Sequence, residues 1–399
     1  MGYIYIALLT LFTLCLIFGL DKGKYKGLLI TGFLLRILIL LIDLNHWMLL
    51  PHAGVDAETF NIIATYNITH TYSTLSLTNY TWVLTFFYYI SDCSRAFAQF
   101  FNVVLGIGTL LVIRRFLTYI HISSKAKQYI MVLATLSPTP IILSGLLIRE
   151  VWVQFFIALS MLYFFHWFTQ GKAKHVIYCL SAVLGAAAMH QGMIALGLGF
   201  SITFICYRPK YGHVKLSGTA IFGILLMLAF AVFFINNMDI MGDKAGRLKN
   251  GDTDEALMAS YNSLGGGSDY LTWLPIDNAK MALLFSPLKM FYFMYSPIPM
   301  DWRGLNDIIS FVIDSCMYIY LTWMIWRTKL KNSVLSHFKK FMAITLLITI
   351  FIFGLGSSNA GQAMRHRTKI LPAMIMTLAV CLSERKQDQT FTLTGSRIS

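Results

Sequence analysis

Long apolar segments constrain this chain more than any other feature of its sequence. Runs of about 18 or more predominantly apolar residues recur along the whole length, and a helix needs roughly 20 such residues to cross a bilayer. Of the 399 residues, 57% are hydrophobic and only 13% are charged, against roughly a quarter charged in ordinary soluble domains. The sequence therefore excludes a soluble globule, a fibrous protein and a disordered chain. It predicts a membrane protein with many crossings.

The expected fold is an all-α transmembrane helical bundle that forms one integral-membrane domain over residues 1–399. The first apolar segment lacks a basic leading region and a small-residue cleavage site, so we interpret it as a retained crossing rather than a signal peptide. About eleven crossings are expected, near residues 3–20, 27–44, 97–114, 128–147, 151–168, 175–190, 192–206, 214–236, 308–326, 340–357 and 369–383.

The distribution of charge predicts the orientation of the bundle. A net charge of +14 is compatible with nucleic-acid binding, but the basic residues lie in short loops between apolar segments, so no nucleic-acid partner is expected. Assigning alternate loops to one side collects most Lys and Arg residues there, which makes that side cytoplasmic by the positive-inside rule. Among the acidic residues, only Asp21, Glu384 and Asp388 fall on the same side. We therefore expect the chemistry on the outer face.

Two predicted outer loops, 45–96 and 237–307, are long enough to hold structure of their own. In the first loop, residues 56–66 have apolar side chains at helical spacing and predict a short helix lying in the membrane interface. The second loop begins polar and rich in glycine, which is typical of a mobile flap. Its apolar end contains prolines at positions 287, 297 and 299, which argue against one continuous helix.

Asp56 and Glu58 lie together at the start of the expected interfacial helix. A structural role is available to both, because Asp56 suits the cap and Glu58 complements the positive end of the helix. A carboxylate at the outer membrane boundary can also accept the proton of an attacking sugar hydroxyl, which is the general-base step of glycosyl transfer. Since capping and catalysis are compatible, Asp56 and Glu58 are the candidate catalytic residues.

Arg149 and His190 lie near predicted helix ends and have two interpretations each. A charged pair such as Arg149 and Glu150 between two crossings is usually a solvated turn or a local ion pair. Arg149 can instead grip a phosphate, which its planar guanidinium suits better than a lysine does. His190 follows a small-residue stretch that permits close helix packing, which favours a structural histidine, and it is kept as a substrate-binding candidate.

The most informative group is Arg365, His366 and Arg367, with Lys369 close by. It lies at the outer end of a predicted crossing, where the positive-inside tendency gives no reason for a cationic cluster. Long side chains that reach lipid headgroups are one explanation. Binding of a lipid-linked phosphate or pyrophosphate is the other, and it makes Arg365, His366 and Arg367 candidate substrate-binding residues.

Arg36 is expected in the middle of a crossing, where an unpaired charge is expensive. A structural pair with Asp43 or Asp314 is slightly favoured over a contact with substrate. The histidines and cysteines show no spacing typical of metal ligands, so the sequence indicates no metal and no cofactor.

Short motifs in chain order resemble those of bacterial polytopic surface-polysaccharide enzymes, namely the Wzy-type O-antigen or repeat-unit polymerases and the related GT-C glycosyltransferases. The motifs are Gly54–Phe60, Tyr80–Trp82 leading to Asn102–Gly106, Arg149–Glu150 and Asn359–Arg367. The resemblance implies a GT-C-like bundle in the bacterial inner membrane with its active site facing the periplasm. It implies catalysis by an acid in the first outer loop and arginines that face an undecaprenyl-(pyro)phosphate-linked oligosaccharide. A chain-length regulator and the lipid bilayer are the further partners it implies.

The leading hypothesis is an enzyme that polymerises undecaprenyl-linked repeat units of O-antigen or capsule, with Asp56 as base. Two alternatives stay open: a GT-C glycosyltransferase that adds a single sugar from a polyprenyl-phosphate donor, and a transporter or flippase of lipid-linked oligosaccharide. Transport favours internal repeats and polar residues distributed through the crossings; neither is evident in this chain.

Overall fold

The computed structural model describes residues 1–20, 23–48, 55–70, 75, 78–209, 212–214, 267–276 and 278–383. Within these ranges the chain is almost entirely helical, and its one small sheet pairs β1 (Tyr207–Arg208) with β2 (His213–Val214) in antiparallel register. Six helical segments of the described ranges are long and apolar enough to cross a membrane. The protein is therefore an all-α membrane protein, as the sequence predicts.

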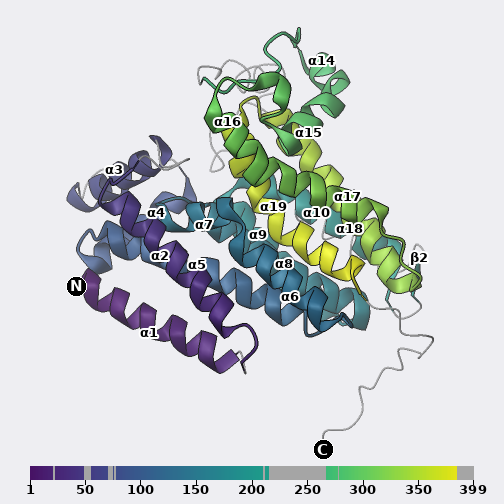
Figure 1. Cartoon of the computed structure of the whole chain (residues 1–399), viewed down its shortest axis with the longest axis horizontal. Helices are drawn as coiled ribbons and strands as arrows, with labels where there is room; N and C mark the ends of the chain where they lie inside the picture. The colour runs from purple at the N-terminus through teal and green to yellow at the C-terminus, as the bar shows by residue number, and fades with distance from the viewer. Residues whose placement is uncertain are drawn as a thin grey trace, which may run out of the picture.

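Helices coincide with most of the predicted crossings (Figure 1). The crossing expected at 214–236 lies outside the described residues. The matching helices are α1 (Gly2–Leu20), α2 (Lys26–Leu44), α5 (Arg95–Phe116), α8 (Glu150–Gln170), α9 (Ala173–Met189), α10 (Ile194–Cys206), α17 (Cys316–Arg327), α18 (Ser333–Gly356) and α19 (Ala360–Cys381). The 3₁₀ turn η1 (Gln191–Met193) precedes α10. The helix α16 (Leu305–Ser310) and the π-helical η3 (Phe311–Ser315) precede α17.

The crossing expected at 128–147 is broken into α6 (Ser124–Leu136) and α7 (Pro138–Gly145). Pro138 begins α7, where a missing N–H costs nothing, and it disfavours a helical conformation at Ser137. Gly145 ends α7 in close contact with α2, because a Cβ at this position would lie 2.8 Å from the backbone nitrogen of Leu40. The break leaves residues 146–149 as a short connection that leads into α8.

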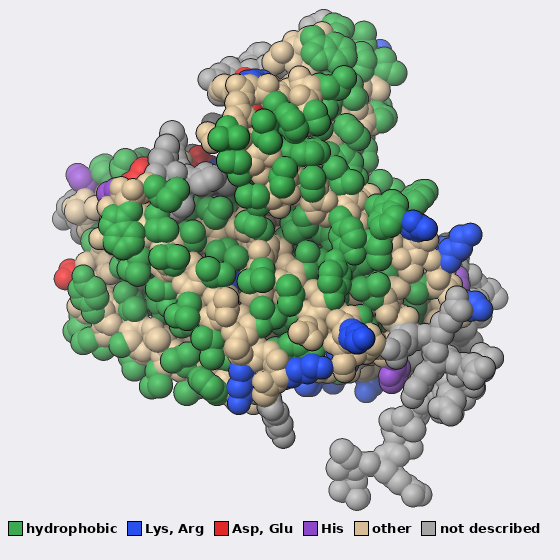
Figure 2. Space-filling model, viewed as in Figure 1, with side chains coloured by type: hydrophobic (Ala, Val, Ile, Leu, Met, Phe, Trp, Pro, Cys, Tyr) green, Lys and Arg blue, Asp and Glu red, His purple; other side chains and the backbone are tan. Residues whose placement is uncertain are grey.

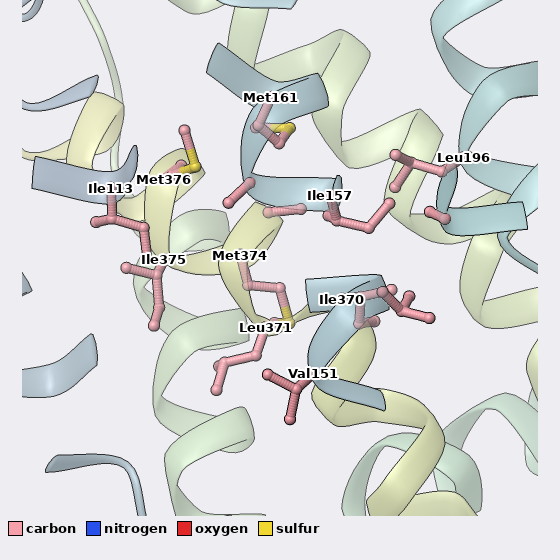
Figure 3. Close-up of a cluster of buried hydrophobic side chains, with 14 of the residues drawn as sticks. Ile113, Val151, Ile157, Met161, Leu196, Ile370, Leu371, Met374, Ile375 and Met376 are labelled. Carbon is pink, nitrogen blue, oxygen red and sulfur yellow. The ribbon is translucent and has the colours of Figure 1, made fainter. Parts of the chain in front are cut away.

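Helix α19 lies in the middle of the bundle and contacts α8, α18, α15 and α17 (Figure 1). Its side chains are buried without interruption from Arg367 to Cys381. Figure 3 shows apolar side chains of α19 and α8 interdigitating at the centre of the core. The residues that it labels are Ile113 of α5, Val151, Ile157 and Met161 of α8, Leu196 of α10, and Ile370, Leu371, Met374, Ile375 and Met376 of α19.

The predicted outer loops form helices beside one end of the bundle. The interfacial segment predicted at 56–66 is helical and lies within α3 (Val55–Thr69), which packs against α4 (Asn79–Ser91) through the rings of Phe60 and Tyr80. The described part of the second loop contains α14 (Ala279–Leu284), α15 (Ser286–Tyr295) and η2 (Pro299–Asp301). Its three prolines do interrupt the helix, as predicted. The expected flap falls largely on residues 237–266, outside the described residues.

Charged side chains separate on the surface shown in Figure 2. Most of the visible Lys and Arg side chains gather along the lower edge and at the right-hand end. Visible Asp and Glu side chains lie on the opposite sides, at the left and at the top of the view, near α3 and α16. The bundle therefore has a basic end and, opposite it, an end that carries α3.

Candidate functional site

Arg365 joins three helices at the end of the bundle that carries α3. From the second turn of α19, its Nη1 lies 2.5 Å from Oδ2 of Asp56 on α3, and its Nη2 lies 2.8 Å from Oε1 of Glu150 on α8. Glu150 is buried, whereas half of the Asp56 side chain is exposed. Arg149, Lys369, His190 and His366 lie close enough to interact electrostatically with this pair of contacts. We call the seven residues the Arg365 cluster.

Asn102 of α5 fixes the backbone that leads into the cluster. Its buried side-chain amide donates hydrogen bonds to the carbonyls of Leu146 (2.8 Å) and Ile148 (3.0 Å), and it accepts one from Nε1 of Trp152 (2.9 Å). These bonds hold the 146–149 connection against α5, so that α8 begins at the cluster. Glu150 then stands in the first turn of α8, where a negative charge suits the helix dipole.

Arg149 contributes a cation that has no acidic partner. Its guanidinium lies 5.9 Å from the ring centroid of Phe60, and no hydrogen bond or ion pair joins it to any residue that the structure describes. Burial lowers the pKa of Arg149, because desolvation disfavours the charged form. A guanidinium nevertheless stays protonated in proteins. The cluster therefore includes one cation available to a negatively charged ligand.

The inner part of the cluster contains a buried lysine and two histidines. Nζ of the fully buried Lys369 lies 3.6 Å from Oε1 of Glu150, which is too long for a hydrogen bond. The rings of His190 and His366 meet edge to face, with centroids 4.8 Å apart. The nitrogens of each ring can donate or accept a hydrogen bond.

The Arg365 cluster concentrates polar atoms whose hydrogen-bonding capacity is unused. Buried polar groups in proteins are nearly always hydrogen-bonded, and leaving one unpaired costs about 1–3 kcal/mol. Arg149, Arg365 and Lys369 face the carboxylates of Asp56 and Glu150 in this cluster, so that basic side chains outnumber acidic ones. A ligand with negative charge and several acceptor oxygens fits this arrangement. Within the cluster, the buried atoms that have no hydrogen-bond partner among the described residues are Arg149 Nε, Glu150 Oε2, His190 Nδ1, Arg365 Nε and Lys369 Nζ.

Two of the predicted site residues lie outside the cluster. Glu58 pairs with Arg95 of α5 (2.7 Å), which also binds Asp43. Arg367, expected to face outward, is fully buried instead: its Nε lies 2.7 Å from Oδ2 of Asp314, and its Nη1 lies 2.6 Å from the carbonyl oxygen of Ser296. Two residues beyond Arg365, it is rotated by about 200° around the helix and so faces the interior. The expectation that Arg367 faces outward is therefore wrong, and Arg367 has no part in the proposal below.

The predicted pairing of Arg36 is also wrong. Asp43 lies one turn too far along α2, about 10 Å away in the axial direction, and it binds Arg95 and Gln99. Asp314 is taken by Arg367. Arg36 is buried and donates to a backbone carbonyl of its own helix, with no acidic partner in the described part of the chain.

Glu150 and Lys369 belong to the cluster, although neither is among the predicted site residues. Both carry a signal in the sequence: Glu150 adjoins Arg149, and Lys369 follows Arg365 by one helical turn. No group of three His, Cys, Asp or Glu side chains suited to a metal ion occurs within the described ranges. Comparisons with protein-family models, curated proteins and solved structures gave no match.

Proposed function

We propose that this protein is a membrane glycosyltransferase, a polymerase that joins undecaprenyl-linked repeat units of O-antigen or capsule. In this proposal the bundle is GT-C-like, has about eleven crossings and lies in the bacterial inner membrane, with the Arg365 cluster facing the periplasm. The observation that supports it best is the excess of buried, incompletely hydrogen-bonded cations at the end of the bundle opposite the basic end. A lipid-linked pyrophosphate presents the matching charge at the membrane boundary.

The donor pyrophosphate binds to Arg149 and Arg365 in the proposed complex. Guanidinium groups bind phosphate oxygens through two parallel hydrogen bonds, and such charge-assisted bonds are about twice as strong as neutral ones. Arg149 forms no ion pair with any described residue, so its guanidinium is available to an incoming anion. Arg365 reaches the anion by exchanging its contact with the half-exposed Asp56. Lys369 and His190 supply further donors deeper in the cluster.

Asp56 acts as the general base in the proposed reaction. The phosphate competes for Arg365, and this competition releases the half-exposed Asp56 carboxylate to accept a hydrogen bond from the acceptor hydroxyl. The hydroxyl oxygen then bonds to the anomeric carbon of the donor, its proton passes to Asp56, and the bond from the anomeric carbon to the pyrophosphate oxygen breaks. The electron pair of that bond stays on the pyrophosphate, where Arg149 and Arg365 stabilise the developing charge.

The proposal is tested by Asp56→Asn and Arg149→Gln in a strain that lacks the native gene. Loss of the long-chain surface polysaccharide ladder is expected for both variants, since a missing general base alone typically costs 10²- to 10⁴-fold in rate. Arg303→Gln is the matched control, because Arg303 is exposed and bonds a backbone carbonyl outside the cluster. Full-length ladders from membranes with normal amounts of either cluster variant contradict the proposal.

A liposome assay separates polymerisation from the two alternatives. Purified protein is reconstituted with a lipid-linked oligosaccharide, alone or together with a polyprenyl-phosphate sugar, and both chain growth and movement across the bilayer are measured. Chain growth without translocation supports the polymerase. Addition of one sugar that stops there assigns a single-addition transferase, and translocation without new glycosidic bonds assigns a carrier.

A further inference from the structure

An apolar groove lies between α15 and α17, both of which contact α19. The groove encloses about 710 Å³ and is lined almost entirely by apolar side chains. On α17, Ile319, Thr322, Trp323 and Trp326 share one helical face and form a wall of the groove. Trp323 and Trp326 remain largely exposed. None of the residues in this groove belongs to the Arg365 cluster.

Cations gather where this groove reaches the basic end of the molecule. The guanidinium of Arg327 lies 5.0 Å from the ring centroid of Trp323, so the last cation of α17 stands on the groove wall itself. Lys329 and Lys331 follow directly, and all three cations are exposed. The sequence has no acidic residue between Asp314 and Glu384, and no ion pair joins these cations to any described residue. Figure 2 shows basic side chains gathered at this end of the molecule.

Phospholipid dimensions match the groove. From Phe311 to Trp326 the chain advances by 15 residues, which is roughly 22 Å at a helical rise of 1.5 Å per residue. One leaflet of the hydrocarbon core is about 15 Å deep, so the groove is long enough for an acyl chain. Tryptophans beside cations are typical of a helix end at the lipid headgroups. The groove wall also belongs to a segment apolar enough to span a membrane, 305–327, so lipid rather than a soluble protein surrounds it.

We propose that this groove binds an anionic phospholipid from the leaflet at the basic end of the bundle. One acyl chain lies between α15 and α17, against Ile319 and Trp323, and the phosphate of the headgroup binds Arg327, Lys329 and Lys331. The proposal does not depend on the glycosyltransferase function, because none of these residues takes part in the proposed reaction.

The test uses the full chain in nanodiscs of phosphatidylcholine, into which phosphatidylglycerol with brominated acyl chains is titrated. Bromine quenches nearby tryptophan fluorescence, and the double variant Trp323→Phe/Trp326→Phe isolates the signal of the groove. Brominated phosphatidylglycerol should quench this signal at a lower mole fraction than brominated phosphatidylcholine does. Arg327→Gln, Lys329→Gln and Lys331→Gln each remove one cation. Each variant should raise the midpoint, which is the mole fraction of brominated phosphatidylglycerol at half-maximal quenching, about fivefold, because a basic residue near an anionic surface contributes about 1 kcal/mol.

Two controls distinguish specific binding of a lipid in the groove from a general attraction of basic residues to anionic lipid. The triple variant Lys125→Gln/Lys172→Gln/Lys174→Gln removes three exposed cations remote from the groove in sequence, and it should leave the midpoint unchanged. Thr322→Phe fills the groove without changing its charge and should abolish the preferential quenching. Equal effects of the two sets of charge variants, or preferential quenching that survives Thr322→Phe, would overturn the proposal. Displacement of the brominated lipid by undecaprenyl phosphate at lower mole fractions than by plain phosphatidylglycerol would overturn the assignment to a phospholipid.

Discussion

Arg365 and Arg367 stand two residues apart on α19, yet their surroundings differ completely. Arg367 is enclosed: Asp314 binds it through two nitrogens, backbone carbonyls take its remaining donors, and Thr139 satisfies the other oxygen of Asp314. Arg365 holds two carboxylates, but its own Nε and polar atoms of its neighbours Arg149 and Lys369 have no hydrogen-bond partner. The difference shows that two arginines on one helix can differ in how completely their side chains are paired.

The Arg367 network connects elements that are distant in the sequence. Arg367 of α19 meets Asp314 in η3 and the carbonyl of Ser296 after α15, and Thr139 adds the first turn of α7. A buried ion pair with all of its hydrogen bonds made fixes how these elements pack. The Arg365 cluster is satisfied only in part, so we expect it to contribute less to folding and, under the proposed function, more to binding. Four predictions test this contrast, in order of decreasing effect.

Arg367→Ala should have the largest effect on stability, about 3–5 kcal/mol, because it leaves the Asp314 charge buried without a partner. Thermal unfolding of the purified protein in detergent measures this loss. Replacing both partners, as in Arg367→Met/Asp314→Leu, should be less harmful than Arg367→Ala, since no buried charge then remains. If Arg365→Ala were as destabilising as Arg367→Ala, the contrast between the two arginines would be lost.

Arg149→Gln should weaken binding of undecaprenyl pyrophosphate by about 10- to 100-fold, the equivalent of one or two charge-assisted hydrogen bonds at about 1.5–3 kcal/mol each. Its unfolding temperature should stay the same, because Arg149 makes no ion pair in the described part of the chain. Isothermal titration in detergent gives the affinity, with undecaprenol as the uncharged control ligand. Unchanged affinity together with reduced stability would make Arg149 a structural residue.

Asn102→Ala should destabilise the protein by about 1–3 kcal/mol, because the buried carbonyls of Leu146 and Ile148 lose their donor. It should also weaken pyrophosphate binding, since the same bonds position Arg149 at the start of α8. Asn332→Ala, which removes the cap of α18 at the other end of the bundle, is the control. This control should cost about 1 kcal/mol and leave the affinity unaltered.

Glu58→Gln should have the smallest effect, below about 1 kcal/mol on stability, because Glu58 is about half exposed and Arg95 retains Asp43. The polysaccharide ladder should persist in this variant and disappear in Asp56→Asn. Loss of the ladder in Glu58→Gln, with normal protein levels, would transfer the role of base from Asp56 to Glu58.

The sequence predicted the candidate residues that lie at the ends of single helices. The acid at the start of α3 and the cations near the start of α19 were recognised because both lie at the ends of apolar segments. The contact between Asp56 and Arg365 joins helices far apart in the chain, and its detail rests on tertiary packing. The same packing explains the errors: the pattern of α19 does not reveal which neighbour buries Arg367, and Lys369 joins the cluster only because Glu150 of α8 lies beside it.

The sequence by itself determined that the chain is a helical membrane protein, where most of its helices run and that its acidic and basic residues separate toward opposite ends. These properties follow from hydrophobicity, charge and proline, which act within a few residues of the chain. Only the tertiary structure decided which charges pair, that α6 and α7 are distinct, and that Arg365 faces a half-exposed acid while Arg367 faces the core. The reason is physical: the partner of a buried charge depends on which helix faces meet, and that depends on packing between distant segments.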